Sequence, residues 1–155
     1  MSSAEVASPR SQPAHRSRRR RSRELVLQVL YQWLLSDNGA DALCRQAAEQ
    51  KDYTRADTQY FELLTHGVIE RAAELNAALQ PFLDRPVQQL SPIEHAALLL
   101  AAYELMYVPE VPYRVAINEA VELTRIYGGT DGHKYVNGVL DKLAAQVRPA
   151  ETRKT

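Results

Sequence analysis

One segment, residues 91–107, constrains the fold of this chain more than any other. It reads SPIEHAALLLAAYELMY. Ser91, Pro92 and Glu94 form a complete helix start, with a hydroxyl at the N-cap, a proline where no N–H is needed and an acid at the third position. The rest of the segment is apolar on nearly every side and too short to cross a bilayer, so it predicts a central helix surrounded by other helices. Its polar exceptions are Glu94, His95 and Glu104.

Apolar residues at helical spacing predict five further helices around the central one. The expected helices cover about 22–36, 41–50, 54–82, 112–127 and 131–147. In the last two, the residues expected to face inward are Val115, Ala116, Ala120, Leu123 and Ile126 or their near neighbours, followed by Val136, Val139, Leu140 and Leu143. No segment has the two-residue period of a strand. The sequence therefore predicts an all-α fold with a single compact helical domain over 18–147.

The formal net charge of zero conceals a division between a basic start and an acidic body. Residues 1–23 contain seven of the 19 basic residues and one of the 19 acidic residues. Residues 1–17 contain little that could be buried, so we expect them to form a disordered tail. We expect residues 148–155 to form a polar C-terminal tail.

The arginines at 18–23 allow two interpretations. They could be a solvated tail, or they could contact RNA or DNA, because guanidinium groups pair with phosphates and also stack on bases. The second interpretation makes candidate RNA-binding residues of Arg18, Arg19, Arg20, Arg21 and Arg23. An acidic body behind a basic arm argues against a protein that binds nucleic acid over its whole surface.

Two exposed stripes are candidate contact surfaces. Tyr31 and Leu35 lie opposite the predicted core face of the first helix, which suggests a partner surface beside the basic arm. Asp131, Tyr135, Gly138 and Lys142 share a stripe that combines a flat aromatic ring, a small residue and a cation, as a base-stacking surface does. The glycine-rich loop 128–134 leads into a helix start, where free N–H groups could favour an anion or simply form a turn.

The sequence gives no sign of an enzyme, a metal site or a cofactor. The four histidines lack ligand spacing, and Cys44 is the only cysteine, so neither an internal disulfide nor a cysteine zinc cluster can form. We find no nucleophile with a base at a suitable spacing. No apolar run follows the basic segment, so we expect a cytoplasmic protein without a secretory signal and without a membrane partner.

Five blocks of sequence, in order, resemble one known family. They are RRRSRE at 19–24, LYQW at 30–33, YEL at 103–105, VPYRVAINEA at 111–120 and HKYVNGVLDK at 133–142. Together they closely resemble the NusB family of bacterial transcription antitermination factors, over about residues 19–147. The last two blocks are long and specific.

The resemblance implies an all-helical domain of about six to seven helices in two sub-bundles, and a non-enzymatic RNA-binding factor. It implies pairing with NusE, which is also a small-subunit ribosomal protein, and binding to the single-stranded boxA element of nascent ribosomal RNA. It also implies contact with other Nus factors and RNA polymerase. The family's RNA contacts correspond to Arg19, Arg20, Arg21, Arg23, Asp131, Lys134 and Tyr135, and its NusE contacts correspond to Tyr31 and Glu94.

Two other classes of protein compete with this interpretation. A similar fold forms the front part of RNA cytosine methyltransferases, but this sequence shows no Rossmann-type cofactor segment after the helical domain. The chain could instead be a protein-only adaptor or a homodimer. In that case the face with Tyr31, Leu35 and Glu94 would pair with itself, and the arginines would only keep the chain in solution.

Overall fold

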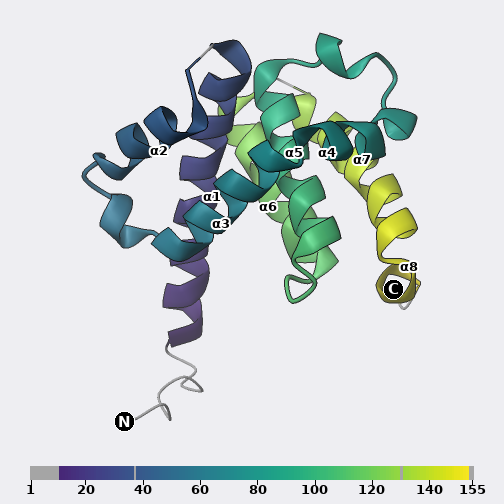
Figure 1. Cartoon of the computed structure of the whole chain (residues 1–155). Coiled ribbons are helices and arrows are strands. Elements are labelled where there is room, and N and C mark those ends of the chain that lie inside the picture. The colour runs from purple at the N-terminus through teal and green to yellow at the C-terminus, as the bar shows by residue number, and fades with distance from the viewer. Residues whose placement is uncertain (1–10, 37, 130, 154–155) are drawn as a thin grey trace.

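The computed structural model describes residues 11–36, 38–129 and 131–153, and all regular structure within these ranges is helical (Figure 1). The all-α prediction is therefore confirmed. The α-helices are α1 Ser11–Leu35, α2 Ala40–Ala48, α3 Thr58–Glu70, α4 Ala72–Leu79, α5 Pro92–Tyr107, α6 Tyr113–Tyr127, α7 Gly132–Val147 and α8 Pro149–Thr152. Short 3-10 turns η2, η3 and η4 cover Tyr53–Arg55, Gln80–Phe82 and Val87–Gln89.

Helix α5 is the predicted central helix, and its start is the one the sequence predicts. The Ser91 hydroxyl accepts a hydrogen bond from the Glu94 N–H. Every residue from Ala96 to Leu105 is buried, and the helix packs against α1, α3, α4, α6 and α7. Its alanines allow close approach, which explains how one helix contacts neighbours from both halves of the chain (Figure 1). Helices α1, α3 and α4 pack against it from the first half of the chain, and α6 and α7 from the second.

The single helix predicted over 54–82 is wrong in its bounds. Asp57 is the N-cap of α3, accepting from the Tyr60 N–H, so the helix starts at Thr58. It breaks at Arg71, whose backbone is non-helical, and the break lets α3 pack on α1 while α4 packs on α5. Gly67 lies within α3, where the Tyr103 ring occupies the space that a side chain at this position would need.

Helix α6 buries three of the five residues predicted to face inward, together with two of their near neighbours. Ala116, Ala120 and Leu123 are buried as expected, but Ile117 and Thr124 join them. Val115 and Ile126 are exposed by 40% and 57%. Neighbouring stripes of this helix are both partly apolar, so the sequence pattern alone could not fix its rotation. The inward residues predicted for α7 are all buried.

Helix α1 begins well before its predicted start at Ser22. Residues 11–17, which we expected to be disordered, form its first turns, whereas residues 1–10 lie outside the described residues. Pro13 fits the first turn because the N–H groups there have no intrahelical acceptor. Arginine and alanine are good helix formers, so the basic run continues the helix rather than ending it.

The chain beyond α7 is not the simple polar tail that we predicted. Arg148 is nearly buried, and α8 follows it directly. Its guanidinium donates hydrogen bonds to the carbonyl oxygens of Glu104, Leu105, Val108 and Val111. Helix α5 ends among these carbonyls, so Arg148 satisfies acceptors that a helix C-terminus leaves open. Residues 154–155 lie outside the described residues.

Candidate nucleic-acid interface

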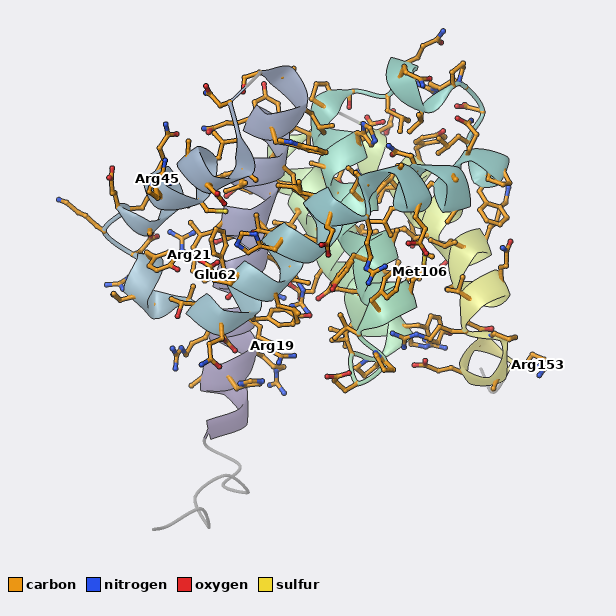
Figure 2. All side chains as sticks on the ribbon, viewed as in Figure 1. Arg19, Arg21, Arg45, Glu62, Met106 and Arg153 are labelled. Atoms are coloured by element: carbon orange, nitrogen blue, oxygen red, sulfur yellow. The ribbon has the colours of Figure 1, made fainter. Side chains whose placement is uncertain are left out.

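The predicted arginine arm is part of a long helix whose side chains pair with the acidic body. Arg20 donates to both carboxylate oxygens of Glu119, at 3.2 and 2.8 Å, and these bonds raise the pKa of its guanidinium. Arg21 pairs with Glu24 and Asp52. Figure 2 shows Arg19 and Arg21 among the side chains around α1. For the described part of the arm, the plain solvated tail is therefore the wrong interpretation.

Arg23 departs most from its predicted role, because it is buried. Its side chain is 5% exposed and that of Glu104 is 1% exposed, and Arg23 Nη2 lies 2.9 Å from Glu104 Oε2. The Tyr60 hydroxyl donates to the same carboxylate. Burial opposes the charge of Arg23, but Glu104 more than offsets it and raises the pKa of the guanidinium. Arg23 is therefore an anchor for α1 and is not available for a phosphate.

Arg19 links this buried cluster to the surface. Its guanidinium lies 3.9 Å from the centre of the Tyr60 ring, as in a cation–π contact, and its Nε lies 3.7 Å from Asp57 Oδ2. Burial, followed by the nearby Glu104, raises the pKa of Tyr60, so the phenol stays protonated and can donate. Arg18 donates to the Ala56 carbonyl at 3.1 Å.

The arginines that remain accessible are at the outer end of α1. Arg16, Arg18 and Arg20 are exposed, and the side chain of Arg20 is 61% exposed despite its bonds to Glu119. Arg16 lay in the segment that we expected to be disordered, so sequence reasoning missed it as a candidate contact. A guanidinium that is held on one side and open on the other is oriented for a phosphate at little entropic cost.

The predicted stripe on α7 forms one side of a groove. Tyr135, Gly138 and Lys142 line it together with Lys134, and the opposite side comes from Pro81, Phe82, Leu83 and Asp84. Asp131 lies beside it, with its carboxylate 3.7 Å from Lys134 Nζ. The structure thus brings together the α7 residues predicted to bind RNA.

Contacts from the loop before α5 fix the orientation of Tyr135. Its hydroxyl donates to Asp84 Oδ1 at 2.9 Å, and the Arg85 guanidinium lies 4.9 Å from the ring centre. Hydrogen bonds from Arg85 and then Tyr135 lower the pKa of Asp84 to about 2, so this carboxylate stays ionised. The sequence analysis assigned no role to either residue.

The glycine loop before α7 does not present an open anion site. A Cβ at Gly132 would lie 2.6 Å from Glu94 Oε2, so the Glu94 carboxylate already occupies the space over the helix start. A negative group at a helix N-terminus is stabilised by the helix dipole. Asp131 is at the N-cap position but makes no side-chain cap bond, and Thr130 lies outside the described residues.

The candidate partner surface is composite. Tyr31 of α1 lines a shallow groove with Ile93 of α5 and Tyr127 at the end of α6, and Leu35 is 57% exposed. Glu94 does not line this groove, because its carboxylate lies against Gly132 at the start of α7. Tyr127 is an exposed residue that the sequence analysis did not assign to this surface.

The two cationic surfaces are separate. No arginine of α1 lines the groove on α7. A second cavity lies between α1 and α6, where Arg16, Arg19 and Arg20 line it, and no residue of α7 does. A ligand that contacts both must be extended, as a single strand of nucleic acid is.

Other kinds of site are not visible in the described parts of the chain. No three histidine, cysteine or acidic side chains within 11–36, 38–129 and 131–153 gather as they would around a metal ion. No helix among these residues is both long enough and apolar enough to cross a membrane.

Comparison with known proteins gives one consistent result. Residues 20–145 match the model of the NusB family. A transcription antitermination protein NusB from Cupriavidus pinatubonensis is 55% identical over 136 residues, which cover 88% of this chain and 81% of that protein. The NusB from Methylobacillus flagellatus is 56% identical over 133 residues, covering 86% of each chain.

Solved structures have the same fold. A structure of NusB from T. maritima has a TM-score of 0.77 and 27% identity, covering 88% of this chain and 97% of that one. A complex of the antitermination factors NusB and NusE with double-stranded RNA has a TM-score of 0.77 at 24% identity, covering 83% and 96%. The second similarity supports the fold alone.

Proposed function

The chain belongs to the NusB family, and from this premise we propose that it is a non-enzymatic transcription antitermination factor that binds RNA together with NusE. The observation that carries the proposal is the row of arginines on α1, in which Arg19, Arg20 and Arg21 are held by acidic side chains of the same domain and Arg16, Arg18 and Arg20 are exposed. The groove with Tyr135, Lys134 and Lys142 supplies a second RNA contact. Residues 18–147 would be the binding domain, and the cytoplasm its location.

We further propose that the RNA is boxA of nascent ribosomal RNA, and that the complex joins other Nus factors on RNA polymerase. A solved complex with the same fold contains NusB, NusE and double-stranded RNA, and it is our guide to the kind of partner. We assign electrostatic affinity to α1 and base stacking to Tyr135, because guanidinium groups pair well with phosphates and an aromatic ring can stack on any base. Asp131 would contribute at the edge of the groove.

The first test is the triple variant Arg16→Ala, Arg18→Ala, Arg20→Ala. We expect weaker binding to a boxA-like single-stranded RNA and a log–log salt dependence that is flatter by about 2, because each lost phosphate contact removes about 0.7 from the slope. Fluorescence anisotropy at several salt concentrations measures both quantities. A control with Arg45→Ala, Arg125→Ala and Arg153→Ala changes the net charge equally at exposed positions outside the arm. An equal loss in the control would show that only net charge matters.

The second test concerns the partner surface. We expect Tyr31→Ala with Leu35→Ala to weaken NusE binding by at least about tenfold, since an exposed aromatic ring beside an apolar side chain is typical of an interface anchor. Binding is measured by calorimetry, with Leu63→Ala as the control, because Leu63 is similarly exposed on α3. Unchanged NusE binding would place the interface elsewhere. Light scattering separates the alternative, in which this face forms a homodimer that the double variant dissociates.

A further inference from the structure

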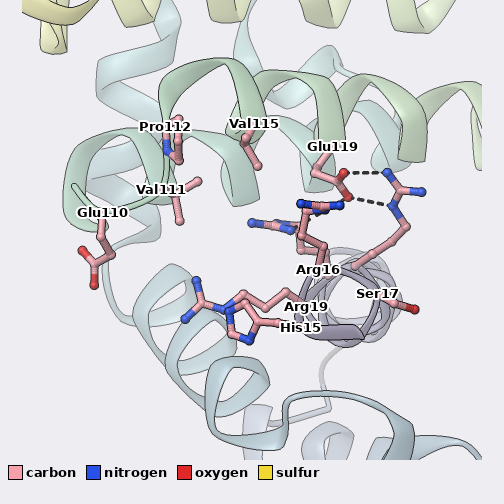
Figure 3. A pocket seen from close by; sticks show the side chains of 11 residues that line it. His15, Arg16, Ser17, Arg19, Glu110, Val111, Pro112, Val115 and Glu119 are labelled. Atoms are coloured by element: carbon pink, nitrogen blue, oxygen red, sulfur yellow. Dashed lines mark hydrogen bonds and ion pairs between the residues drawn. The ribbon is translucent and has the colours of Figure 1, made fainter. Parts of the chain in front are cut away.

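A cavity of about 500 Å³ lies between the first turns of α1 and the turn that joins α5 to α6 (Figure 3). Its volume lies within the usual range for sites that enclose one small ligand. It is open on one side, and no side chain of α7 reaches it. The residues that line it are His15, Arg16, Ser17, Arg19, Arg20, Arg23, Glu110, Val111, Pro112, Val115 and Glu119.

One wall of this cavity is cationic and partly unpaired. Arg16 forms no ion pair with any described residue, although it faces the cavity from α1 (Figure 3). Arg19 also lines the cavity, but its Nε is shielded from solvent and lies 3.7 Å from Asp57 Oδ2, so Asp57 holds it in place. Arg20 is fixed by Glu119 and remains exposed. Donors of this kind, oriented but not saturated, suit a phosphate group.

The opposite wall, formed by the turn before α6 and by α6 itself, has an apolar part made by Pro112 and Val115 beside the acidic Glu110 and Glu119. Val115 is 40% exposed at the start of α6, where the sequence pattern predicted an inward residue. Pro112 lies beside it, and both face α1 across the cavity (Figure 3). An exposed apolar wall opposite guanidinium groups matches a ligand that has one flat apolar part and one anionic part.

We propose that this cavity receives one unstacked nucleotide of a bound RNA strand, with its base against Val115 and Pro112 and its phosphate on Arg16 and Arg20. The inference rests on the proposed RNA binding and adds to it a base-contacting subsite on the arm. Bases of single-stranded RNA can be splayed out and inserted into such sites, whereas bases in a duplex cannot. The arginine arm would then contact bases as well as phosphates.

The acidic residues at this cavity favour a nucleotide over an acidic peptide. Glu119 and the exposed Glu110 both line it. A peptide that presents several carboxylates would be repelled by them. A nucleobase can instead donate an exocyclic amino or ring N–H group to a carboxylate oxygen, and its single phosphate can stay on the arginine side.

The test combines a scan of the RNA with a change in the apolar wall. Each nucleotide of a boxA-like single-stranded RNA is replaced in turn by an abasic nucleotide, and binding to the full chain is measured by anisotropy. We expect Val115→Trp to fill the cavity without disturbing the core, because Val115 is exposed. Val115→Gln replaces the apolar surface with a polar amide and adds much less bulk than Trp. Leu63→Trp, at an exposed position on α3 outside the cavity, is the matched control.

For the wild-type chain we expect one position in the α1-bound part of the RNA at which loss of the base weakens binding by about tenfold. Both Val115 variants should bind intact RNA less tightly and lose this position-specific penalty. Leu63→Trp should retain the penalty, and NusE binding should be unchanged in all three variants.

A penalty that persists in folded Val115 variants would overturn the subsite. Salt-sensitive RNA binding by the wild type without any such position would overturn it as well. Loss of NusE binding would assign the cavity to a protein and overturn it too. Absence of any RNA binding by the wild type would instead overturn the proposed function.

Discussion

Replacing Glu104 with Gln is expected to lower the free energy of unfolding by about 3–5 kcal/mol, the usual effect of removing one partner from a buried ion pair. The guanidinium of Arg23 would remain in the core without its counter-charge, since its side chain is only 5% exposed. Glu119 could compensate only in part, because its Oε1 lies 3.9 Å from Arg23 Nη1 and it already binds Arg20. Urea denaturation followed by circular dichroism measures the change.

Two further variants separate the charge from the packing at this site. Tyr60→Phe keeps the ring against Arg19 and removes one hydrogen bond to Glu104, so we expect a loss of about 1–2 kcal/mol. The double variant Arg23→Met with Glu104→Leu removes both charges and should recover most of the stability lost in Glu104→Gln. If the double variant is as unstable as the single one, the cost comes from packing and the unpaired charge is not its cause.

The stability of this pair matters for function because it fixes α1 against the central helix. Arg23 is one turn from Arg19 and Arg20, so the buried bond sets the direction in which the exposed arginines point. A folded Glu104 variant should therefore bind RNA more weakly than the wild type even though Glu104 lies outside the proposed contact surface. In such a variant α1 would be less ordered, so its arginines would be less well preorganised for RNA.

The sequence predicted the core of this fold well and its polar contacts poorly. The apolar segment 91–107 can be buried on all sides only as a central helix, and α5 is that helix. Glu104 was visible as an acid inside this segment, but the sequence does not show which of five clustered arginines pairs with it. Helical spacing could have indicated that Arg23 is the buried one. Arg23 lies three residues before Val26 and seven before Leu30, so it shares their face of the helix.

The surfaces were harder to predict because each one is assembled from several helices. Tyr31 was recognised as exposed from α1 alone, but Ile93 and Tyr127 join it only through the packing of α5 and α6. Arg16 and Val115 lie almost a hundred residues apart in sequence and line the same cavity. No local pattern predicts such a meeting, since it depends on the rotation of α6 and on the early start of α1.

The second large effect is expected for Arg148→Ala, which should lower the free energy of unfolding by about 3 kcal/mol. Four carbonyl oxygens at the end of α5 and in the following turn would lose their donor, and each buried acceptor left unsatisfied costs about 1–3 kcal/mol, with water replacing part of the loss. Arg148→Lys should recover only a fraction, because an ammonium group lacks the planar fork that reaches several carbonyls at once. Thermal and urea unfolding measure both variants.

Arg153→Ala is the matched control for Arg148→Ala, because Arg153 is an exposed arginine five positions further along the chain. We expect it to change stability by less than about 0.5 kcal/mol. Equal effects of the two variants would mean that the bonds of Arg148 contribute nothing specific.

Arg148 also donates a hydrogen bond, at 2.8 Å, to the carbonyl oxygen of Val111, which lines the cavity beside α1. We therefore expect Arg148→Ala, studied under conditions in which it is folded, to loosen the apolar part of the cavity wall. The penalty for an abasic nucleotide at this cavity should then be smaller than in the wild type. Arg148 would in this way connect the end of the central helix to RNA recognition, although it lies outside the RNA-binding surface.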